Sequence, residues 1–580
     1  MNANLKPLHS ITFWISLMGL IAMISNFGFS QSDLSLKLLD EFYFSVIGFG
    51  VISTFARYFQ GRKLLNRKVF IFDFLFVVFA LCLFYMYLFV GVIFETDLLL
   101  ENPIWVKIAV LLTFIRAFSE LKINFNRTFL NPGQLFILSF LSIIFLGSFL
   151  LILPKATYNG ISYLDALFTS TSAVCVTGLT VVDTGTHFTQ FGQTVILILI
   201  QFGGLGILTF ASYFSYFFKG GTSYENQLAL SDITSSKKLG EVFSTLKYII
   251  LITFGIELFS GILIYTSVGS SNFATQSDRL FFSAFHSISA FCNAGFSTLT
   301  NSFYETGFRF NYYLQLVVIF TFVLGGLGFP IVVNTLKYLK YKIITLFSYR
   351  KSRYRPWVLN LNSRITLFTT LSISLVAFVA FYFLEYNNTL AEHNGFGKIV
   401  TALFGATTPR TAGFNTINTA AMAFPTLMLV LLLMWIGASP QSTGGGIKTS
   451  TFAIAILNIL SLAKGKSRIE IFRREIADIS VRRAFAIISL SLLVIGFAII
   501  VITIFDPEKE LVDIAFECFS AYSTTGLSLG ITGGLSSASK LVIIVVMFVG
   551  RISMLSLVIA VFRKVKHKNY SYPKAEITIN

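Results

Sequence analysis

Charged residues are scarce in this sequence, and so are the residues that most often build metal, redox and catalytic sites. Of its 580 residues, 12% are charged and 55% are hydrophobic, and the mean hydropathy is +0.76. A chain with so little charge cannot have water as its main solvent. Its four cysteines show no paired spacing of the metal or redox kind, and it has five histidines. With no phosphate-binding loop and no large polar segment, we do not expect an enzyme.

Long apolar runs take the place of the missing polar sequence. Several reach the roughly 20 residues that a helix needs to cross the hydrocarbon core of a bilayer, among them Val69–Phe94, Leu135–Leu153, Leu246–Val268 and Ala484–Ile504. The first run, Ile11–Phe29, lacks the basic flank and the small-residue cleavage site of a signal peptide. We therefore expect a multi-pass membrane protein in contact with the lipid bilayer, with its first run kept as a helix.

The net charge of +17 is confined to particular loops. Lys and Arg gather in 57–68, 337–364, 464–483 and 563–574, whereas the intervening loops carry Asp97, Glu101, Asp183, Glu305, Glu392, Asp506 and Glu508. The excess of Lys and Arg in cytoplasmic loops places the basic loops and both termini in the cytoplasm, and the expected location is the inner (plasma) membrane of the cell. Segregated charge of this kind favours a membrane topology over a nucleic-acid partner.

An internal repeat organises the chain after about residue 130. Four short segments each place a glycine after polar or small residues and before Leu or Phe, and the glycines lie 117, 118 and 113 residues apart. They are Val176-Thr177-Gly178-Leu179, Asn293-Ala294-Gly295-Phe296, Thr411-Ala412-Gly413-Phe414 and Thr524-Thr525-Gly526-Leu527. A period this regular predicts one unit copied four times.

Each predicted unit contains an apolar span, a short helix that ends just before the glycine, and a second span. The short helices are expected at Leu164–Ala173, Arg279–Ala290, Lys398–Thr408 and Leu511–Tyr522, and at that length they dip into the membrane without crossing it. The predicted fold is therefore an all-α membrane protein with four pseudo-symmetric helix, pore-loop, helix repeats around one pore. The expected N-terminal division is 1–130, with about four extra helices near 11–29, 42–58, 69–94 and 104–119. The four repeats are expected at 131–220, 221–340, 341–465 and 466–580.

The four glycine segments have the properties of a cation filter. Rings of backbone carbonyls can replace the hydration shell of K⁺ without adding net charge. Aiming successive carbonyls at one axis needs positive φ, which glycine adopts without a Cβ penalty. The short helices would also point the negative ends of their dipoles at the ion. The sequence thus predicts that K⁺ is bound by backbone carbonyls and is the transported ion, with no prosthetic group.

Glycine-rich interruptions recur in the second spans. Gly203-Gly204-Leu205-Gly206 and Gly325-Gly326-Leu327-Gly328 are interpreted as close helix packing. The longest, Gly437 to Gly446, is interpreted as irregular backbone that faces the conduction path, since such backbone at membrane depth must line a cavity or be buried. At the matching depth of the fourth repeat stands Arg551. It either opposes cation flow or pairs with the broken helix, or else snorkels to the cytoplasmic face.

These motifs resemble the Trk/Ktr/HKT superfamily of K⁺ transporters, and most of all its KtrB-type membrane subunits. The resemblance covers about residues 134–563 and rests on TSTSAVCVTGLTVVDT, FHSISAFCNAGFSTL, TPRTAGFNTI, SPQSTGGGIKT and SAYSTTGL. It implies a K⁺ filter at the four glycine segments, and Gly178 favours K⁺ because Na⁺-preferring HKT members carry Ser at that glycine.

The resemblance also implies a gate and partners. The implied gate is an intramembrane loop, to which Arg551 of the fourth repeat is added. The loop residues are Gly437, Ser439, Pro440, Ser442, Thr443, Gly444, Gly445, Gly446 and Lys448. The implied partners are a second copy of the chain, as a homodimer, and a KtrA-like cytosolic ring of nucleotide-binding regulatory subunits.

Two questions stay open from the sequence. The pore is either a gated K⁺ uptake channel or a Na⁺- or H⁺-coupled K⁺ symporter, for which Asp73, Glu257 and Glu517 are the intramembrane carboxylates. Residues 1–130 have no counterpart in the family pattern. They form either a packing or docking bundle or a voltage sensor, although Arg116 near the end of the fourth span is not part of an arginine ladder.

Overall fold

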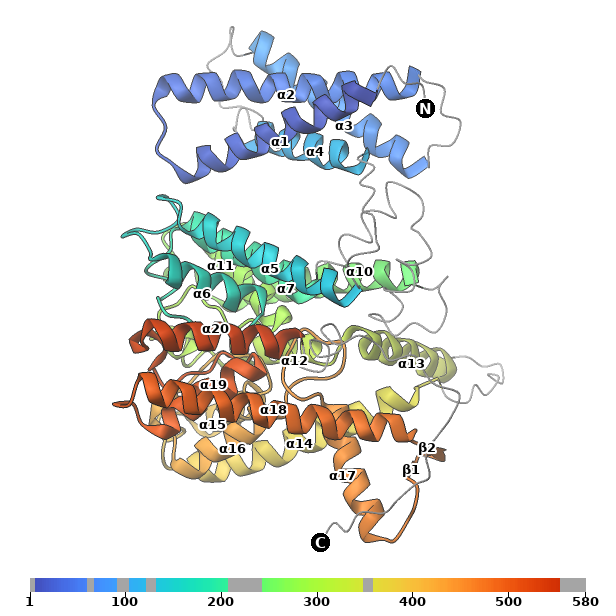
Figure 1. Ribbon diagram of the computed structural model, residues 1–580, viewed down its shortest axis with the longest axis vertical. Coiled ribbons are helices and arrows are strands. Elements are labelled where there is room, and N and C mark those ends of the chain that lie inside the picture. The colour runs from blue at the N-terminus through green and yellow to red at the C-terminus, as the bar shows by residue number, and fades with distance from the viewer. Residues whose placement is uncertain are drawn as a thin grey trace.

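The computed structural model describes residues 6–59, 67–90, 104–120, 132–206, 242–347 and 358–552, and these are almost entirely helical (Figure 1). The one sheet among them is a hairpin of β1 (Glu470–Ile471) and β2 (Arg474–Glu475), which lies in the predicted basic loop 464–483. The expectation of an all-α membrane protein is confirmed.

Four helices form an N-terminal bundle, drawn in blue in Figure 1. They are α1 (Lys6–Gly28), α2 (Asp33–Phe59), α3 (Arg67–Tyr85, extended by a π-helical turn Met86–Val90) and α4 (Ile104–Glu120). Apolar side chains from α2, α3 and α4 form its core: Tyr43, Phe44, Val46, Ile47, Ala80, Leu83, Ala109 and Val110. The end of α1 contacts the rest of the chain, because Gly28 O accepts a hydrogen bond of 3.0 Å from Lys155 N.

A buried charge cluster joins three helices of this bundle. Asp73 of α3 is 1% exposed and pairs with Arg57 of α2 at 2.8 Å and with Arg116 of α4 at 2.6 Å. Tyr58 donates a further hydrogen bond to Asp73 Oδ2 at 2.9 Å. Arg57 is expected from the sequence to lie in the basic loop 57–68, but the structure buries it (3% exposed), because Asp73 supplies the opposite charge that a guanidinium needs away from water.

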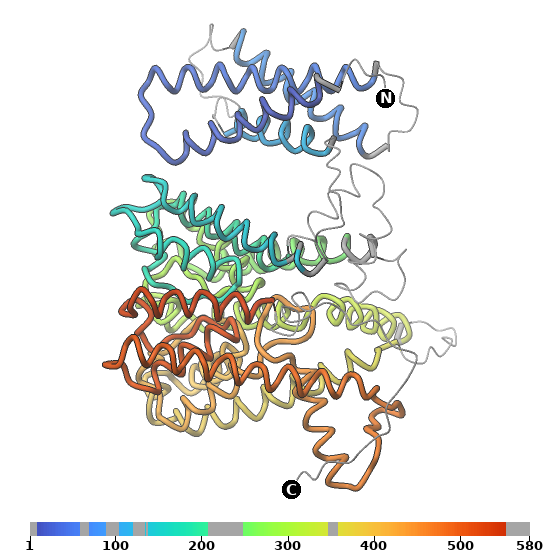
Figure 2. Tube along the Cα trace, in the orientation of Figure 1, coloured from blue at the N-terminus to red at the C-terminus, as the bar shows by residue number. Residues whose placement is uncertain are grey.

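The remaining described helices form four successive units, which Figure 2 traces from cyan to red. Unit 1 contains α5 (Pro132–Leu151), α6 (Tyr163–Val174) and α7 (Gln190–Leu205). Unit 2 contains α10 (Val242–Ser267), α11 (Gln276–Cys292), α12 (Tyr312–Gly326) and α13 (Phe329–Phe347), and unit 3 contains α14 (Leu361–Glu385), α15 (Gly395–Thr407), α16 (Phe424–Trp435) and α17 (Thr449–Ala463). Unit 4 contains α18 (Asp478–Phe505), α19 (Leu511–Ser523) and α20 (Ser537–Ile552). Short 3₁₀ turns occupy Ser270–Asn272, Ser302–Tyr304, Thr419–Ala421 and Thr532–Gly534. The domain boundaries at 130, 220, 340 and 465 stay predictions.

The four predicted short helices are present as α6, α11, α15 and α19. They contain 12, 17, 13 and 13 residues, and each ends within three to six residues of its motif glycine. Side-chain caps fix the start of three of them, because Ser162, Thr275 and Asn394 each accept a hydrogen bond from a backbone N–H of the first turn.

The second apolar spans of units 2 and 3 are not single straight helices. By length and composition, six described helices can cross a membrane, and a seventh span results if α12 and α13, which meet at 106°, count as one. The bend falls at Leu327-Gly328, where Gly328 has φ +82° and its backbone lies against Pro440 O. In unit 3 the loop 436–448 separates α16 from α17, as predicted. The residues after 206 in unit 1 and after 552 in unit 4 lie outside the described residues, as do the basic loop 563–574 and part of 337–364.

Replacing Asp73 with Asn is expected to destabilise the N-terminal bundle by about 3–5 kcal/mol, because two buried guanidinium groups would lose their counter-charge. The measurement is the unfolding temperature of the purified protein in detergent. Glu41→Gln, at an exposed position on α2, is the matched control and should leave that temperature unchanged. Equal unfolding temperatures for the two variants would contradict a stabilising role for the cluster.

Candidate functional site

The four motif glycines meet in a closed ring, named here the glycine ring. A Cβ added to Gly178, Gly295, Gly413 or Gly526 would meet the carbonyl oxygen that precedes the glycine of another unit, respectively Ala294, Ala412, Thr525 and Thr177. Unit 1 therefore contacts unit 2, unit 2 contacts unit 3, unit 3 contacts unit 4, and unit 4 returns to unit 1. The four segments that the sequence singled out lie together, and each of these contacts involves one backbone carbonyl of a neighbouring unit.

All four glycines have a left-handed backbone, with φ of +89°, +70°, +77° and +91° in chain order. The residues two positions earlier share this conformation although none is glycine: Val176, Asn293, Thr411 and Thr524, with φ of +57°, +59°, +79° and +50°. Such angles cost free energy in residues with a side chain and concentrate where function constrains the backbone. The sequence placed these four residues in the glycine segments but did not predict their strained backbone, for which the only signal is their place just after a short helix.

Hydroxyl groups of the short helices hold the segments in place. In units 1 and 4 the backbone N–H of Gly178 and Gly526 donates to Ser172 Oγ and Ser520 Oγ, both at 3.1 Å. In units 2 and 3 hydroxyls donate to the residue after the glycine, from Ser289 to Phe296 O at 2.7 Å and from Thr408 to Phe414 O at 2.6 Å. These contacts stabilise the segments, and single-sequence reasoning had no pattern from which to identify them.

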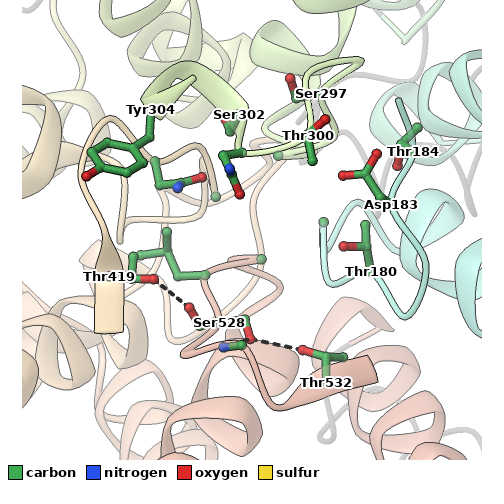
Figure 3. Close-up of a pocket in the computed structure, with 18 of the residues that line it drawn as sticks. Thr180, Asp183, Thr184, Ser297, Thr300, Ser302, Tyr304, Thr419, Ser528 and Thr532 are labelled. Atoms are coloured by element: carbon green, nitrogen blue, oxygen red, sulfur yellow. Dashed lines mark hydrogen bonds between the residues drawn. The ribbon is translucent and has the colours of Figure 1, made fainter. Parts of the chain in front are cut away.

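On one side of the ring the residues that follow the glycines line a cavity of about 450 Å³ (Figure 3), named here the vestibule. Hydroxyl-bearing side chains from units 1, 2, 3 and 4 point toward it, among them Thr180, Thr300, Thr419 and Ser528. Asp183 is the only charged side chain among the described residues of its wall. A wide polar cavity with one carboxylate admits a hydrated cation and disfavours an anion.

On the other side, the loop 436–448 packs against residues that precede the glycines. Thr443 Oγ1 donates to Asn293 Oδ1 at 3.2 Å, and Asn293 Nδ2 donates to Thr411 Oγ1 at 3.3 Å. A Cβ on Gly444 or Gly445 would strike the side chain of Thr411 or Thr524. The loop is thus in direct contact with units 2, 3 and 4, on the face of the ring opposite the vestibule.

The rest of the predicted gate closes the loop on itself and on α12. Ser439 N donates to Gly326 O at 3.0 Å and Ser442 Oγ donates to Ser439 O at 2.6 Å. Gly437 lies against Gly445 and Gly446. The irregular backbone is therefore buried in protein, as membrane depth requires.

Two partly buried cations bind carbonyls of this loop. Lys448 Nζ donates to Gly444 O at 2.5 Å and to Gly445 O at 3.4 Å. Arg551 of α20 donates to Thr443 O, and to Gly203 O of α7 at 2.5 Å. Among the possibilities that the sequence left open for Arg551, the structure shows the contact with the broken helix of unit 3.

The glycines of the second helices allow close approach to the ends of the short helices. A Cβ on Gly203, Gly325 or Gly550 would overlap the carbonyl oxygen of Val174, Phe291 or Tyr522, respectively. The interpretation of the first two glycine clusters as close packing agrees with these contacts. The overlap explains why glycine stands at these positions.

Of the three carboxylates that the sequence singled out as symport candidates, none lies in the glycine ring. Asp73 belongs to the N-terminal cluster, and Glu257 of α10 accepts a hydrogen bond of 3.0 Å from Gln201. Glu517 of α19 lies behind the vestibule wall, where it accepts hydrogen bonds from Ser528 and Thr532.

Helices long enough to cross a membrane, together with the comparisons with known proteins, place the chain among membrane transporters of cations. The profile of the TrkH family, described as cation transport protein, matches residues 106–572. The chain belongs to this family, whose members are transporters and not enzymes. The match begins inside the predicted N-terminal division, at the start of α4.

Individual relatives cover most of the chain. It is 36% identical over 449 residues to the Ktr system potassium uptake protein B of Bacillus subtilis, spanning 77% of this chain and 96% of that protein. It is 34% identical over 458 residues to the potassium/sodium uptake protein NtpJ of Enterococcus hirae, spanning 78% and 97%. The crystal structure of the potassium transporter TrkH from Vibrio parahaemolyticus superimposes with a TM-score of 0.61 at 18% identity, over 85% of this chain and 98% of that one, and shows the fold alone.

Gly203→Ala is expected to destabilise the protein by about 1–3 kcal/mol, since the added methyl group would overlap Val174 O and force the two helices apart. The measurement is the unfolding temperature in detergent. The control is Gly255→Ala in α10, where no heavy atom lies within 4 Å of the added Cβ; this change should be neutral or slightly stabilising. If both variants behave alike, close approach is not what requires glycine at 203.

Proposed function

We propose that the chain is the pore subunit of a gated K⁺ uptake channel or channel-like transporter, with the glycine ring as its selectivity filter. The observation that supports this most directly is the ring itself. Four carbonyls, at Thr177, Ala294, Ala412 and Thr525, lie against the glycines of neighbouring units, so carbonyl oxygens converge from all four units. Such oxygens can replace the water shell of K⁺.

The full proposed filter includes every residue of the four segments. K⁺ enters from the vestibule, exchanges water for carbonyl oxygens along the segments, and leaves past the loop 436–448. The ends of α6, α11, α15 and α19 lie beside the ring, and their helix dipoles add negative potential there.

The loop 436–448 is the proposed gate. It contacts three of the four units just below the ring, and Lys448 and Arg551 bind its carbonyls. Two positive charges at this position oppose the passage of K⁺ and also hold the loop in place. Opening requires that these contacts separate, and Asn293, which joins Thr443 to Thr411, would transmit the movement to the filter.

A Na⁺- or H⁺-coupled symporter is the second candidate, and Glu517 is the observation that favours it. Its Oε2 atom is buried without a hydrogen-bond partner among the described residues, beside hydroxyls of the vestibule wall. A carboxylate so placed can take a proton or a small cation. The relative in Enterococcus hirae, moreover, is named for both potassium and sodium uptake.

The relatives named as parts of a Ktr system support the proposed partners. We infer a homodimer of pores in the plasma membrane, with both termini in the cytoplasm and a KtrA-like nucleotide-binding ring docked on the cytoplasmic side. The exposed basic residues of the hairpin region, including Arg473 and Arg474, are suited to contact such a ring.

Ion flux in liposomes that contain the purified chain tests the function. K⁺ entry down its gradient, with little entry of Na⁺, is expected of the channel, whereas uphill K⁺ uptake driven by Na⁺ or H⁺ would establish symport. Absence of K⁺ flux under every gradient, with the protein folded, would refute both forms of the proposal.

Gly178→Ser is expected to weaken the preference for K⁺ over Na⁺, because its Cβ would strike Ala294 O and its φ of +89° is strained for serine. Reversal potentials in mixed K⁺ and Na⁺ measure the preference. Gly160→Ser is the matched control, since Gly160 also has positive φ but no atom within 4 Å of the added Cβ. Unchanged selectivity in Gly178→Ser would place the filter elsewhere.

Arg551→Gln is expected to raise K⁺ flux several-fold or to free it from regulation, because the charged hydrogen bonds to Thr443 O and Gly203 O are lost. Arg551→Lys keeps the charge and should change the flux less. Flux is measured in liposomes at equal protein density. A Gln variant that folds, dimerises and conducts like the parent would remove Arg551 from the gate.

A further inference from the structure

A small cavity lies behind the filter segment of unit 3, apart from the vestibule. It measures about 40 Å³ and is bounded by α12, α14, the end of α15 and the start of the loop 436–448. Its polar lining is Thr370, Ser374, Thr407 and Arg410, and the rest is apolar side chain or glycine. Nothing in the proposed conduction path uses this cavity.

Arg410 is the unusual member of this lining, because it is a buried cation (9% exposed) beside a cation pore. Its Nη1 donates to Ser374 Oγ at 3.0 Å and to Thr370 O at 3.3 Å, and its Nη2 donates to Gly437 O at 3.5 Å. Its Nε, by contrast, is buried without a partner among the described residues, and so is Thr370 Oγ1. Both residues that carry these unused polar atoms line the same small cavity.

The charge of Arg410 also lacks a carboxylate. None of the ion pairs formed by the described residues includes it. The three oxygens that it contacts are uncharged, so they satisfy hydrogen bonds without cancelling the charge. Arg410 directly precedes Thr411 of the proposed filter, where an unbalanced positive charge would repel K⁺ in a low-dielectric setting.

We propose that this cavity binds one small inorganic monovalent anion, of the halide class, on Arg410 and Thr370. The anion accepts hydrogen bonds from Arg410 Nε and the Thr370 hydroxyl, and it neutralises the guanidinium. K⁺ in the neighbouring filter then no longer faces an uncompensated charge. Anion binding follows from the cavity itself, whereas its effect on flux rests on the proposed K⁺ pore.

The size of the cavity limits the ligand. A single water needs about 10–15 Å³ of such space, so a cavity of about 40 Å³ accepts a halide ion but not gluconate or another organic anion. The competing occupant is water, which would satisfy the same two polar atoms but leave the charge in place. The two occupants can be told apart by measurement, because only a bound halide would make the stability of the protein depend on which anion is in solution.

The first measurement is binding without transport. The unfolding temperature of the purified chain in detergent is compared in potassium chloride, bromide and gluconate at equal ionic strength. Chloride and bromide are expected to raise it relative to gluconate, in a saturable manner, because a ligand that binds only the folded state stabilises it. In Thr370→Val the midpoint chloride concentration should rise about tenfold, as for loss of a hydrogen bond to a charged group.

Matched variants separate this site from general salt effects. Thr369→Val changes the adjacent residue of α14, which does not line the cavity, and should keep the parent response. Arg410→Gln should abolish the difference between anions. If Arg410→Gln does not fold, the Thr370→Val and Thr369→Val pair still decides the question.

The second measurement is K⁺ flux in liposomes with the same three salts. Flux in the parent is expected to fall several-fold when chloride is replaced by gluconate, and Thr370→Val should need more chloride for the same flux. Equal unfolding temperatures in all three salts would mean that the cavity holds water only and would overturn the proposal. Halide binding with unchanged flux would overturn the regulatory role. Halide binding in a protein without K⁺ flux would support the site and refute the proposed function instead.

Discussion

Backbone carbonyls that end inside a membrane protein must find a partner, and this need shapes the centre of the molecule. The short helices α6, α11, α15 and α19 end beside the glycine ring, where their last carbonyls have no intrahelical donors. Lipid offers no hydrogen bonds at that depth. The partners are instead backbone N–H groups of the glycine segments, such as Thr177 N–H to Ser172 O and Ala294 N–H to Ser289 O, together with a hydroxyl of the loop 436–448, from Thr443 to Phe291 O. The arrangement that satisfies the backbone is therefore also one that can bind an ion.

Because the carbonyls need partners, backbones of different helices lie in close contact, and such contact requires glycine at the positions where they meet. Gly203, Gly325 and Gly550 let three second helices lie against the ends of the short helices, and the four ring glycines lie against carbonyls of other units. Larger residues at these places would separate the units and open the ring. Val176, Asn293, Thr411 and Thr524 accept strained backbone angles for the same reason, since their segments are held from both sides.

The positive side chains near the ring are of two kinds, those bound to the loop 436–448 and one held behind the filter. Lys448 and Arg551 contact the carbonyls of the loop 436–448, where a movement of the loop would expose or withdraw their charge. Arg410 is fixed behind the filter by α14 and Gly437. Far from the ring, Arg57 and Arg116 share Asp73, which shows how this chain buries guanidinium groups when a carboxylate is available.

The sequence alone determined the features that depend on nearby residues. Apolar runs and a regular glycine period predicted the helices, the four short helices among them, and the interruption between α16 and α17. The resemblance of the motifs to known transporters predicted the family. Tertiary structure decided what depends on distant residues: the 106° bend between α12 and α13, the hydroxyls that support the filter segments, the partner of Arg551, the burial of Arg57 and the cavity at Arg410. Periodicity records which face of a helix is apolar, but a contact such as Asn293 with Thr411 joins residues 118 positions apart. Only the packing of the units brings such residues within hydrogen-bond distance.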